Sequence, residues 1–465
     1  MAVQAVPGWD LQPSAEQVAL ASNYITNFNF LNQYLPDTYE KEFERYGNRT
    51  VASFLRLVGA EMPSNSDLIK WAEQGRLHTK YTNVNADTAA ALTVQTYTVN
   101  DANVTGIAIR AGQTVLVVDN ATGDSNKGLV TNIVNAGGTG VGSFTLTFYE
   151  AAGTIAINQT CTIMIYGSEF GKGTNGMVGS LEAEDVFFDN KPIIIKDLYT
   201  VSGSDMAQIG WVEISTEDGG TGYLWYLKSE HETRLRFEDY LETAMIEAVP
   251  ALAGSALLAG ATTGSDGIFY VVENRGNVWG GGSPTTLADF DSVIQRLDKQ
   301  GAIEENVIFL NRQFGFDVDD MLAAQNSYGA GGTSYGLFDN DEEMALNLGF
   351  SGFRRGYDFY KTDWKYLNDP TMRGGIDGAG VGINGLLVPA GSTSVYDQIL
   401  GKNAKRPFLH VRYRASETED RRYKTWITGS AGGARTSSLD AMEVNFLSER
   451  AVCTLGANNF FIFKD

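Results

Sequence analysis

The sequence predicts an α+β fold that carries an inserted small all-β domain. Between Tyr81 and Tyr166 the composition shifts to Thr, Val, Ile, Asn and Gly, and the only basic residues are Arg110 and Lys127. After this stretch, Lys228–Val249 has the charge and apolar pattern of one long helix. The remaining chain alternates short strands, short helices and glycine-rich loops, which is typical of helices packed on one side of antiparallel sheets.

Composition bounds the class of protein. With 465 residues the chain is long enough for two or three domains, and 43% apolar residues supply folded cores. The net charge of −21 argues against a protein that binds nucleic acid through its phosphates, because such binding needs a positively charged surface. The two cysteines, Cys161 and Cys453, lie in separate apolar runs and are expected to be buried thiols. We see neither a signal peptide nor a membrane-spanning run, so we expect synthesis in a reducing cytoplasm.

The first 75 residues are predicted to form an extended arm followed by two helices. Residues 1–35 have no clean apolar period. Thr50–Val58 reads as a short apolar helix that ends at Gly59. Ser66 is placed to cap a second helix, Asp67–Gln74.

A run of short strands spaced about ten residues apart favours a small sandwich or barrel. The predicted strands are Leu92–Val99, Val104–Arg110, Gln113–Asp119, Leu129–Val134, Phe144–Tyr149 and Thr160–Ile165.

The most informative stretch is Asn190–Ser204, which is rich in β-branched residues and is followed by a return strand, Ile209–Ile214. At ~3.3 Å per residue, its first 13 residues reach roughly 40 Å. Such an arm outruns the core of a small domain, so we expect a second subunit to cover it.

The helix Lys228–Val249 is expected to have one packed and one solvated face. Its apolar stripe falls on Phe237, Leu241, Met245 and Ala248, with charge pairs on the other side. Further helices are predicted after Thr286, which starts a capping box, and over Asp317–Gln325. The later strands are predicted at Asn306–Leu310, Phe408–Tyr413, Tyr423–Thr428, Val444–Phe446 and, as two strands, Ala451–Lys464.

No motif indicates catalysis or a cofactor. The three histidines, His78, His231 and His410, are isolated from one another. Gly380–Gly385 matches GxGxxG but runs into Leu386 and Pro389 instead of a helix, so chance explains it best. The acidic run Asp339–Glu343 lacks the glycine and distal glutamate of a calcium loop. We therefore predict no catalytic, cofactor-binding or metal-binding residues, although a hydrolase with carboxylates joined only in three dimensions stays open.

Residues 401–424 reverse the charge of the chain locally. Eight basic residues stand against three acidic ones there. A nucleic-acid patch, a contact with an acidic neighbouring subunit, and a merely solvated strand face are the three interpretations, and the subunit contact is preferred over nucleic acid.

The order of these elements resembles a major capsid protein of a tailed bacteriophage with the Hong Kong 97 fold, with some likeness to crAss-like phages. Asn190–Ser204 looks like the strand of the family's E-loop, and Lys228–Val249 is similar to its spine helix. The resemblance implies an N-terminal arm and helices (1–75), an E-loop region (76–222) with the inserted β module (84–168), a peripheral domain (223–284), an axial domain with returning strands (285–440) and C-terminal peripheral strands (441–465).

The function that this resemblance implies is structural and not enzymatic. The chain would self-assemble into hexamers and pentamers of an icosahedral virion shell around double-stranded DNA, without sequence-specific DNA binding, membrane or cofactor. Portal and decoration proteins are the further partners implied, and the bacterial cytoplasm is the implied place of synthesis. A tail or surface adhesin built around the β module is the alternative. The expected subunit-contact residues are Ile193, Ile195, Tyr199, Trp211, Arg412, Arg414, Arg421 and Arg422.

Overall fold

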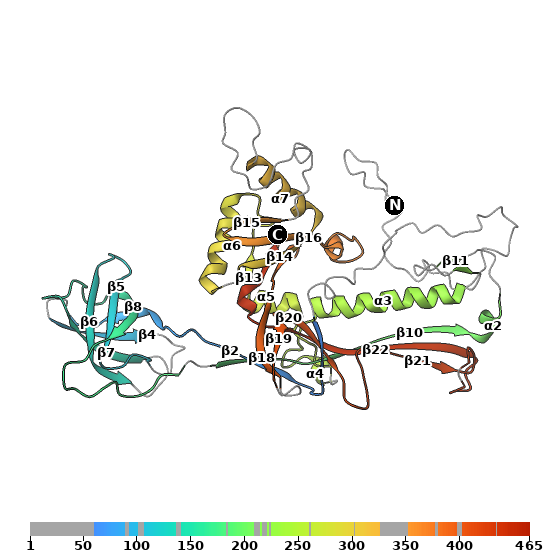
Figure 1. Cartoon of the computed structure of the whole chain (residues 1–465), viewed down its shortest axis with the longest axis horizontal. Coiled ribbons are helices and arrows are strands. Elements are labelled where there is room, and N and C mark those ends of the chain that lie inside the picture. Colours follow the sequence, from blue (N-terminus) through green and yellow to red (C-terminus); the bar gives the residue numbers. More distant parts are fainter. Residues whose placement is uncertain are drawn as a thin grey trace. The chain divides into compact units, whose positions relative to one another are not determined.

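The computed structural model describes residues 60–88, 93–100, 107–135, 141–182, 185–208, 214–215, 221–222, 225–259, 262–301, 303–325, 352–376, 380–397, 402–433 and 435–465. The chain forms two compact units (Figure 1). Unit 1 comprises Met1–Trp71 and Asp189–Asp465, and unit 2 comprises Ala72–Phe188.

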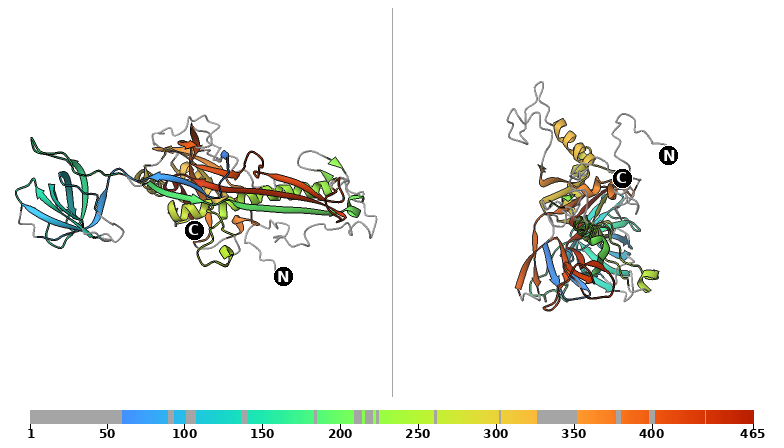
Figure 2. Two further views of the ribbon diagram at one scale, coloured as in Figure 1. Left: turned by 90° about the horizontal axis from the view of Figure 1, so that it is seen from below. Right: turned by 90° about the vertical axis from the view of Figure 1, so that its right-hand side faces the viewer.

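Unit 1 contains a sheet in the order β1-β20-β22-β10, and β21 also pairs with β22. These strands are β1 (Ala60–Ser64), β20 (Leu409–Arg414), β22 (Ala441–Thr454), β10 (Ile193–Ser202) and β21 (Lys424–Gly429). β10 pairs antiparallel with β22 over its whole length, and Figure 2 shows the two strands running side by side. The expected bare arm is therefore corrected: one edge of β10 is already paired within the chain.

The long helix α3 (Trp225–Glu247) lies along this sheet (Figure 1). Three of the four predicted stripe residues, Phe237, Leu241 and Met245, are buried, whereas Ala248 lies beyond the end of α3 and is half-buried. Phe237 and Leu241 pack on Val201 and Phe446 of the sheet. Short helices flank α3: α2 (Gly203–Met206), α4 (Ala256–Ala259) and α5 (Ile268–Arg275).

The second sheet of unit 1 has six strands in the order β13-β23-β17-β14-β16-β15. They are β13 (Asn277–Trp279), β23 (Phe461–Lys464), β17 (Ile383–Pro389), β14 (Glu305–Leu310), β16 (Tyr357–Asp363) and β15 (Gly352–Arg355). The sheet is mixed, since β14 runs parallel to β16 and antiparallel to β17.

Both faces of this mixed sheet are covered. Helices α6 (Leu287–Gln300) and α7 (Arg312–Gln325) share one core with Leu387, while Leu386 faces the other core, which includes α5 and part of α3. The expectation of helices on one side only is wrong for this sheet. The capping box at Thr286 is confirmed, and α7 begins five residues earlier than predicted.

Smaller elements complete the described chain. Three two-stranded sheets pair β11 with β12, β18 with β19 and β2 with β9, and three single-turn 3₁₀ helices lie between the longer elements. Their bounds are β11 (Ile214–Ser215), β12 (Thr221–Gly222), β18 (Ser392–Asp397), β19 (Lys402–Pro407), β2 (Ile69–Gln74), β9 (Asp185–Asn190), η4 (Lys365–Leu367), η5 (Arg373–Gly375) and η6 (Ala457–Asn459).

Unit 2 contains a closed six-stranded barrel, so the choice between sandwich and barrel is decided. The barrel order is β3 (Lys80–Ala86), β4 (Val94–Asn100), β7 (Val141–Phe148), β6 (Ser125–Asn135), β5 (Gln113–Asp119) and β8 (Thr160–Ser168). Inward residues such as Tyr97 and Phe144 stack at 5.5 Å and close the core.

Several sequence-based elements are corrected. The helix predicted over Asp67–Gln74 is strand β2, because residues from Ile69 alternate in burial with a period of two. Ser66 closes a local turn with Leu68 instead of capping a helix. In the stretch predicted as the strand Val104–Arg110, the described residues Ile107 to Arg110 are not a strand.

Other predictions lie outside the described residues. These are the arm over residues 1–35, the helix Thr50–Val58, the acidic run Asp339–Glu343, and the return strand apart from Ile214.

Candidate assembly surfaces

The part of the first sheet that is formed by β10, β22 and β21 has two different faces. The odd-numbered residues of β10 point to α3, since Asp197 lies 3.7 Å from Arg236 and Val201 packs on Phe237. The even-numbered residues therefore point away from α3. This second face continues across β22 to β21, because residues that are paired between neighbouring strands point to the same side of the sheet. Leu198 of β10 is paired with Asn445 of β22, and Asn445 is paired with Trp426 of β21.

The predicted contact residues on β10 belong to the α3 side. Ile193, Ile195 and Tyr199 are half-buried and pack against cores of their own chain. Burial raises the pKa of the Tyr199 hydroxyl to about 12. Their role in subunit contact stays a prediction, and Trp211 lies outside the described residues.

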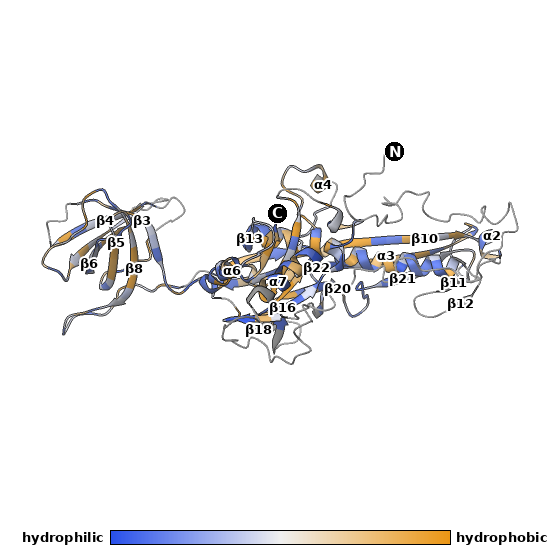
Figure 3. Cartoon of the chain, turned by 90° about the horizontal axis from the view of Figure 1, so that it is seen from above, coloured by the Kyte–Doolittle hydropathy of each residue, from blue (hydrophilic) through white to orange (hydrophobic). Residues whose placement is uncertain are grey.

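The sequence prediction missed the exposed side of β10. Ile194 is 53% exposed and Leu198 is 49% exposed, and Lys196 lies between them. Apolar residues fall on both alternating positions of this strand, so the sequence alone did not show which set faces its own helix. Figure 3 shows the apolar bands along β10.

We name the side that faces away from α3 the open face, and it is made of Ile194, Lys196, Leu198, Asn445, Leu447, Lys424 and Trp426. Its middle strand, β22, contributes the buried Leu447 and the half-buried Asn445, and each outer strand contributes one lysine beside exposed apolar residues. Lys196 and Lys424 both pair in register with Leu447, one from each side. The Lys424 ammonium also lies 5.8 Å from the Trp426 ring centroid.

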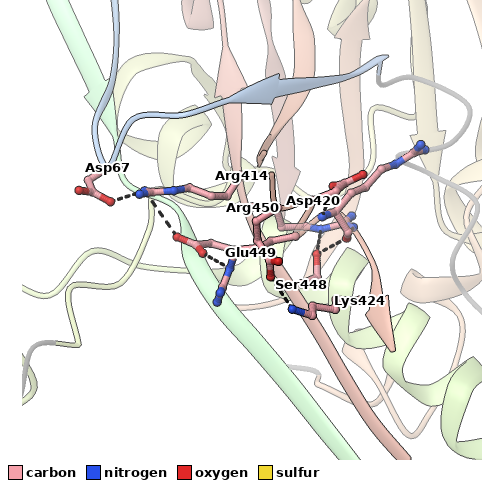
Figure 4. A network of polar contacts seen from close by, with 10 residues as sticks. Asp67, Arg414, Asp420, Lys424, Ser448, Glu449 and Arg450 are labelled. Atoms are coloured by element: carbon pink, nitrogen blue, oxygen red, sulfur yellow. Dashed lines mark hydrogen bonds and ion pairs between the residues drawn. The ribbon is translucent and has the colours of Figure 1, made fainter. Parts of the chain in front are cut away.

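A network of ionic contacts occupies the proximal end of the same sheet (Figure 4). Glu449 accepts from Arg421 at 2.6 Å and lies 3.8 Å from Arg414, which also pairs with Asp67. Because Asp67 bonds to it, the pKa of the Arg414 guanidinium is raised.

The innermost cation of this network is Arg450. It lies 3.3 Å from Glu61, donates to the Ser448 hydroxyl at 2.9 Å and donates to the carbonyl of Arg422 at 3.0 Å. Burial lowers the pKa of Arg450. Arg422 also pairs with Glu61, so this carboxylate of β1 holds two arginines.

The acidic partners of the basic segment thus lie within the same chain. Arg414, Arg421 and Arg422 are paired with carboxylates of β1, β22 and the turn after β1. Arg412 pairs in register with Ala451 in the same sheet. A subunit contact by these arginines stays a prediction, and what the geometry provides is an ionic attachment of β1 to the sheet.

The ribbon β2–β9 presents the most exposed aromatic side chain given for the described residues. Phe187 is 69% exposed and lies on the same side of β9 as Asp185 and Asp189, since the three alternate along one strand. An exposed phenyl ring between two carboxylates is suited to a basic and apolar partner surface.

The described residues contain no group of three or more potential metal ligands, and no described helix is long and apolar enough to cross a membrane. His410 is buried, with Nδ1 3.1 Å from the Pro407 carbonyl, and burial lowers its pKa to about 4. Both cysteines are free and buried, as predicted.

Backbone geometry explains two glycines of the motif at Gly380–Gly385. Gly380 has a positive φ of 79°, and Gly385 sits in β17, where a Cβ would lie 2.9 Å from the Phe309 carbonyl oxygen. The motif runs into strand β17 (Ile383–Pro389), so its backbone does not form the helix N-terminus that a pyrophosphate would bind.

No protein-family model and no curated protein matches this chain. The solved structures that it resembles include capsids. One is the capsid of a native GTA particle, with 9% identity, a TM-score of 0.40 and coverage of 95% of this chain and 99% of that chain. A chain of Microbacterium phage Oxtober96 has 10% identity and a TM-score of 0.39 over 94% and 97%. The mature capsid of bacteriophage PhiM1 has 10% identity and a TM-score of 0.34 over 64% and 78%.

Proposed function

We propose that this chain is the major capsid protein of a tailed phage and assembles into the hexamers and pentamers of an icosahedral head. The observation that carries the proposal is β10, an edge strand of ten residues that exposes Ile194 and Leu198 beside its free edge. Among the described residues no strand pairs with that edge. Long exposed edges of this kind favour pairing with another chain, so monomeric proteins usually cover them.

Shell formation needs many modest contacts instead of one strong site. Fully burying one aliphatic side chain contributes about 1.5–3 kcal/mol, whereas an exposed ion pair contributes about 0–1 kcal/mol. The apolar residues of the open face are therefore the stronger source of affinity. Closed symmetry repeats each contact around a ring and stabilises the whole assembly.

The charge of −21 supports enclosure of DNA without tight adsorption to it. Portal and decoration proteins are the further partners that a phage head implies, and the bacterial cytoplasm is the proposed place of synthesis. The proposed role is structural, since a shell is held by contacts between its subunits.

Negative-stain electron microscopy and analytical ultracentrifugation of the expressed chain test this function. We expect rings or closed shells and a sedimentation coefficient that rises with concentration. A compact monomer at high concentration contradicts the proposal. Long rods contradict it as well.

A further inference from the structure

We propose that Phe187 of one copy, with Asp185 and Asp189 beside it, docks on the open face of a second copy between Lys196 and Lys424. This contact rests on the proposed self-assembly and specifies which two surfaces of neighbouring copies meet. The two surfaces are complementary in charge, and both are incompletely buried within their own chain.

The first surface is the exposed side of β9. Phe187 is 69% exposed, and its two nearest neighbours on that side of the strand are the carboxylates of Asp185 and Asp189. A two-stranded ribbon such as β2–β9 is marginally stable in water on its own, so covering this ring would also stabilise the ribbon.

The second surface is the open face. Trp426 is 36% exposed and Leu198 is 49% exposed, so an apolar floor is available for a ring. Lys196 makes no ion pair among the described residues, and Lys424 pairs with the solvent-exposed Glu419. An exposed pair of this kind contributes little and is readily exchanged for another carboxylate.

The spacing of the charges agrees on the two surfaces. Asp185 and Asp189 are four residues apart on one strand, about 13 Å at ~3.3 Å per residue. Lys196 and Lys424 flank β22 in register, so their backbones are two strand spacings, about 10 Å, apart. Flexible lysine stems span the difference, and an aromatic anchor between two ion pairs fits the pattern of interface hot spots.

Two acids lie on the same side of β22 as the lysines. Glu449 is paired with Arg421 at 2.6 Å. Glu443 accepts from the neutral Thr428 hydroxyl at 2.9 Å and keeps its charge, but it is four residues from Leu447 along β22, about 13 Å away, whereas both lysines pair directly with Leu447. An acidic, aromatic segment is therefore the complementary occupant, and β9 of an identical copy supplies one at equal concentration.

Charge reversal tests the contact. We expect the Lys196→Glu, Lys424→Glu double variant and the Asp185→Lys, Asp189→Lys double variant each to raise the concentration for half-assembly at least tenfold. The chain carrying all four changes should assemble within threefold of the unchanged chain. Circular dichroism and the melting temperature establish that each variant folds. Assembly of either double variant at the unchanged concentration, or failure of a folded fourfold variant to recover, overturns the contact.

Crosslinking gives an independent readout. The Phe187→Cys, Leu198→Cys variant should form disulfide-linked dimers and higher ladders under mild oxidation of assembled particles. The matched control is Phe187→Cys with Ile427→Cys, which places the second thiol on the α3 side of the same sheet at similar exposure. Equal ladders in the two variants overturn the proposed face. If the unchanged chain never assembles, the proposed function itself fails, which is a distinct result.

Discussion

The side-chain amide of Asn190 donates a hydrogen bond of 2.7 Å to the carbonyl oxygen of Val452, which lies 262 residues further along the chain. The same amide donates to Asp266, and its oxygen accepts from the Ser265 hydroxyl at 2.9 Å and from the Asp266 N–H at 2.9 Å. The residue is buried, so all these bonds form away from water. Asn190 therefore fixes the point where β9 ends and β10 begins.

Asn190→Ala should lower the free energy of unfolding by about 3 kcal/mol, because it leaves several buried backbone and hydroxyl groups without a partner. Urea denaturation followed by tryptophan fluorescence measures this change. Asn190→Asp should be at least as destabilising, since a carboxylate oxygen would replace the donor that faces two carbonyl oxygens. Lys191→Ala is the control, and an equal loss there would contradict a special role for Asn190.

Glu61→Gln should cost about 3 kcal/mol, because it removes the carboxylate that faces the buried Arg450 and also Arg422. The matched control is Glu419→Gln, which removes the partner of Lys424 at an exposed site. We expect no measurable change in the urea midpoint of the control. Similar midpoints for both variants would show that β1 is not held by this network.

The sequence predicted best where the signal is local. The stripe of Phe237, Leu241 and Met245 gives α3, and Thr286 with Asp289 gives the start of α6. Both depend on residues within a few turns of one another, so tertiary context adds little to them.

The sequence-based prediction was wrong where a strand pairs with a segment far away in the sequence. Strand β2 has a plausible helix cap at Ser66, and only its pairing with β9 decides against a helix. Strand β3 was missed because Val84 and Ala86 are its only fully buried side chains. The outward side of β10 was also missed, since Ile194 and Ile195 are alike in sequence and only α3 distinguishes them.

Both thiols should be unreactive in the folded protein. Burial raises the pKa of Cys161 to about 11 and that of Cys453 to about 12, and the thiolate is the nucleophile. Labelling with a chromogenic disulfide at pH 8 should be at least a hundredfold slower than in urea. In the Cys161→Ser variant the remaining thiol, Cys453, reports the opening of unit 1. In the Cys453→Ser variant the remaining thiol, Cys161, reports the opening of unit 2. Rapid labelling of either native thiol would contradict its burial.

Stability should fall on acidification because of His410. Its folded pKa of about 4 lies below the unfolded value of about 6.5, so the unfolded chain binds the proton more readily. The stabilising contribution is therefore present above pH 6.5 and is lost as the pH falls towards 4, by about 3 kcal/mol in total.

His410→Gln should flatten the dependence of the unfolding free energy on pH between 6.5 and 4. Carboxylates with lowered pKa, such as Asp291, act in both proteins and cancel in the difference. Urea midpoints at five pH values measure the two slopes. Parallel slopes would show that His410 is protonated without cost in the folded chain.

Gly429→Ala should destabilise the distal hairpin of β21 and β22 more than Gly433→Ala does. Both glycines have positive φ, 120° and 89°, so an alanine carries a conformational cost of about 1–2 kcal/mol at either site. Only at Gly429 does an added Cβ meet backbone, 1.9 Å from the Ala441 carbonyl oxygen, whereas nothing lies within 4 Å of it at Gly433. The backbone pairing of Gly429 with Met442 must then shift, which moves Trp426 and the rest of the open face. Hydrogen exchange of β21 amides measures this shift directly, and equal protection in the two variants would refute the close approach as its cause.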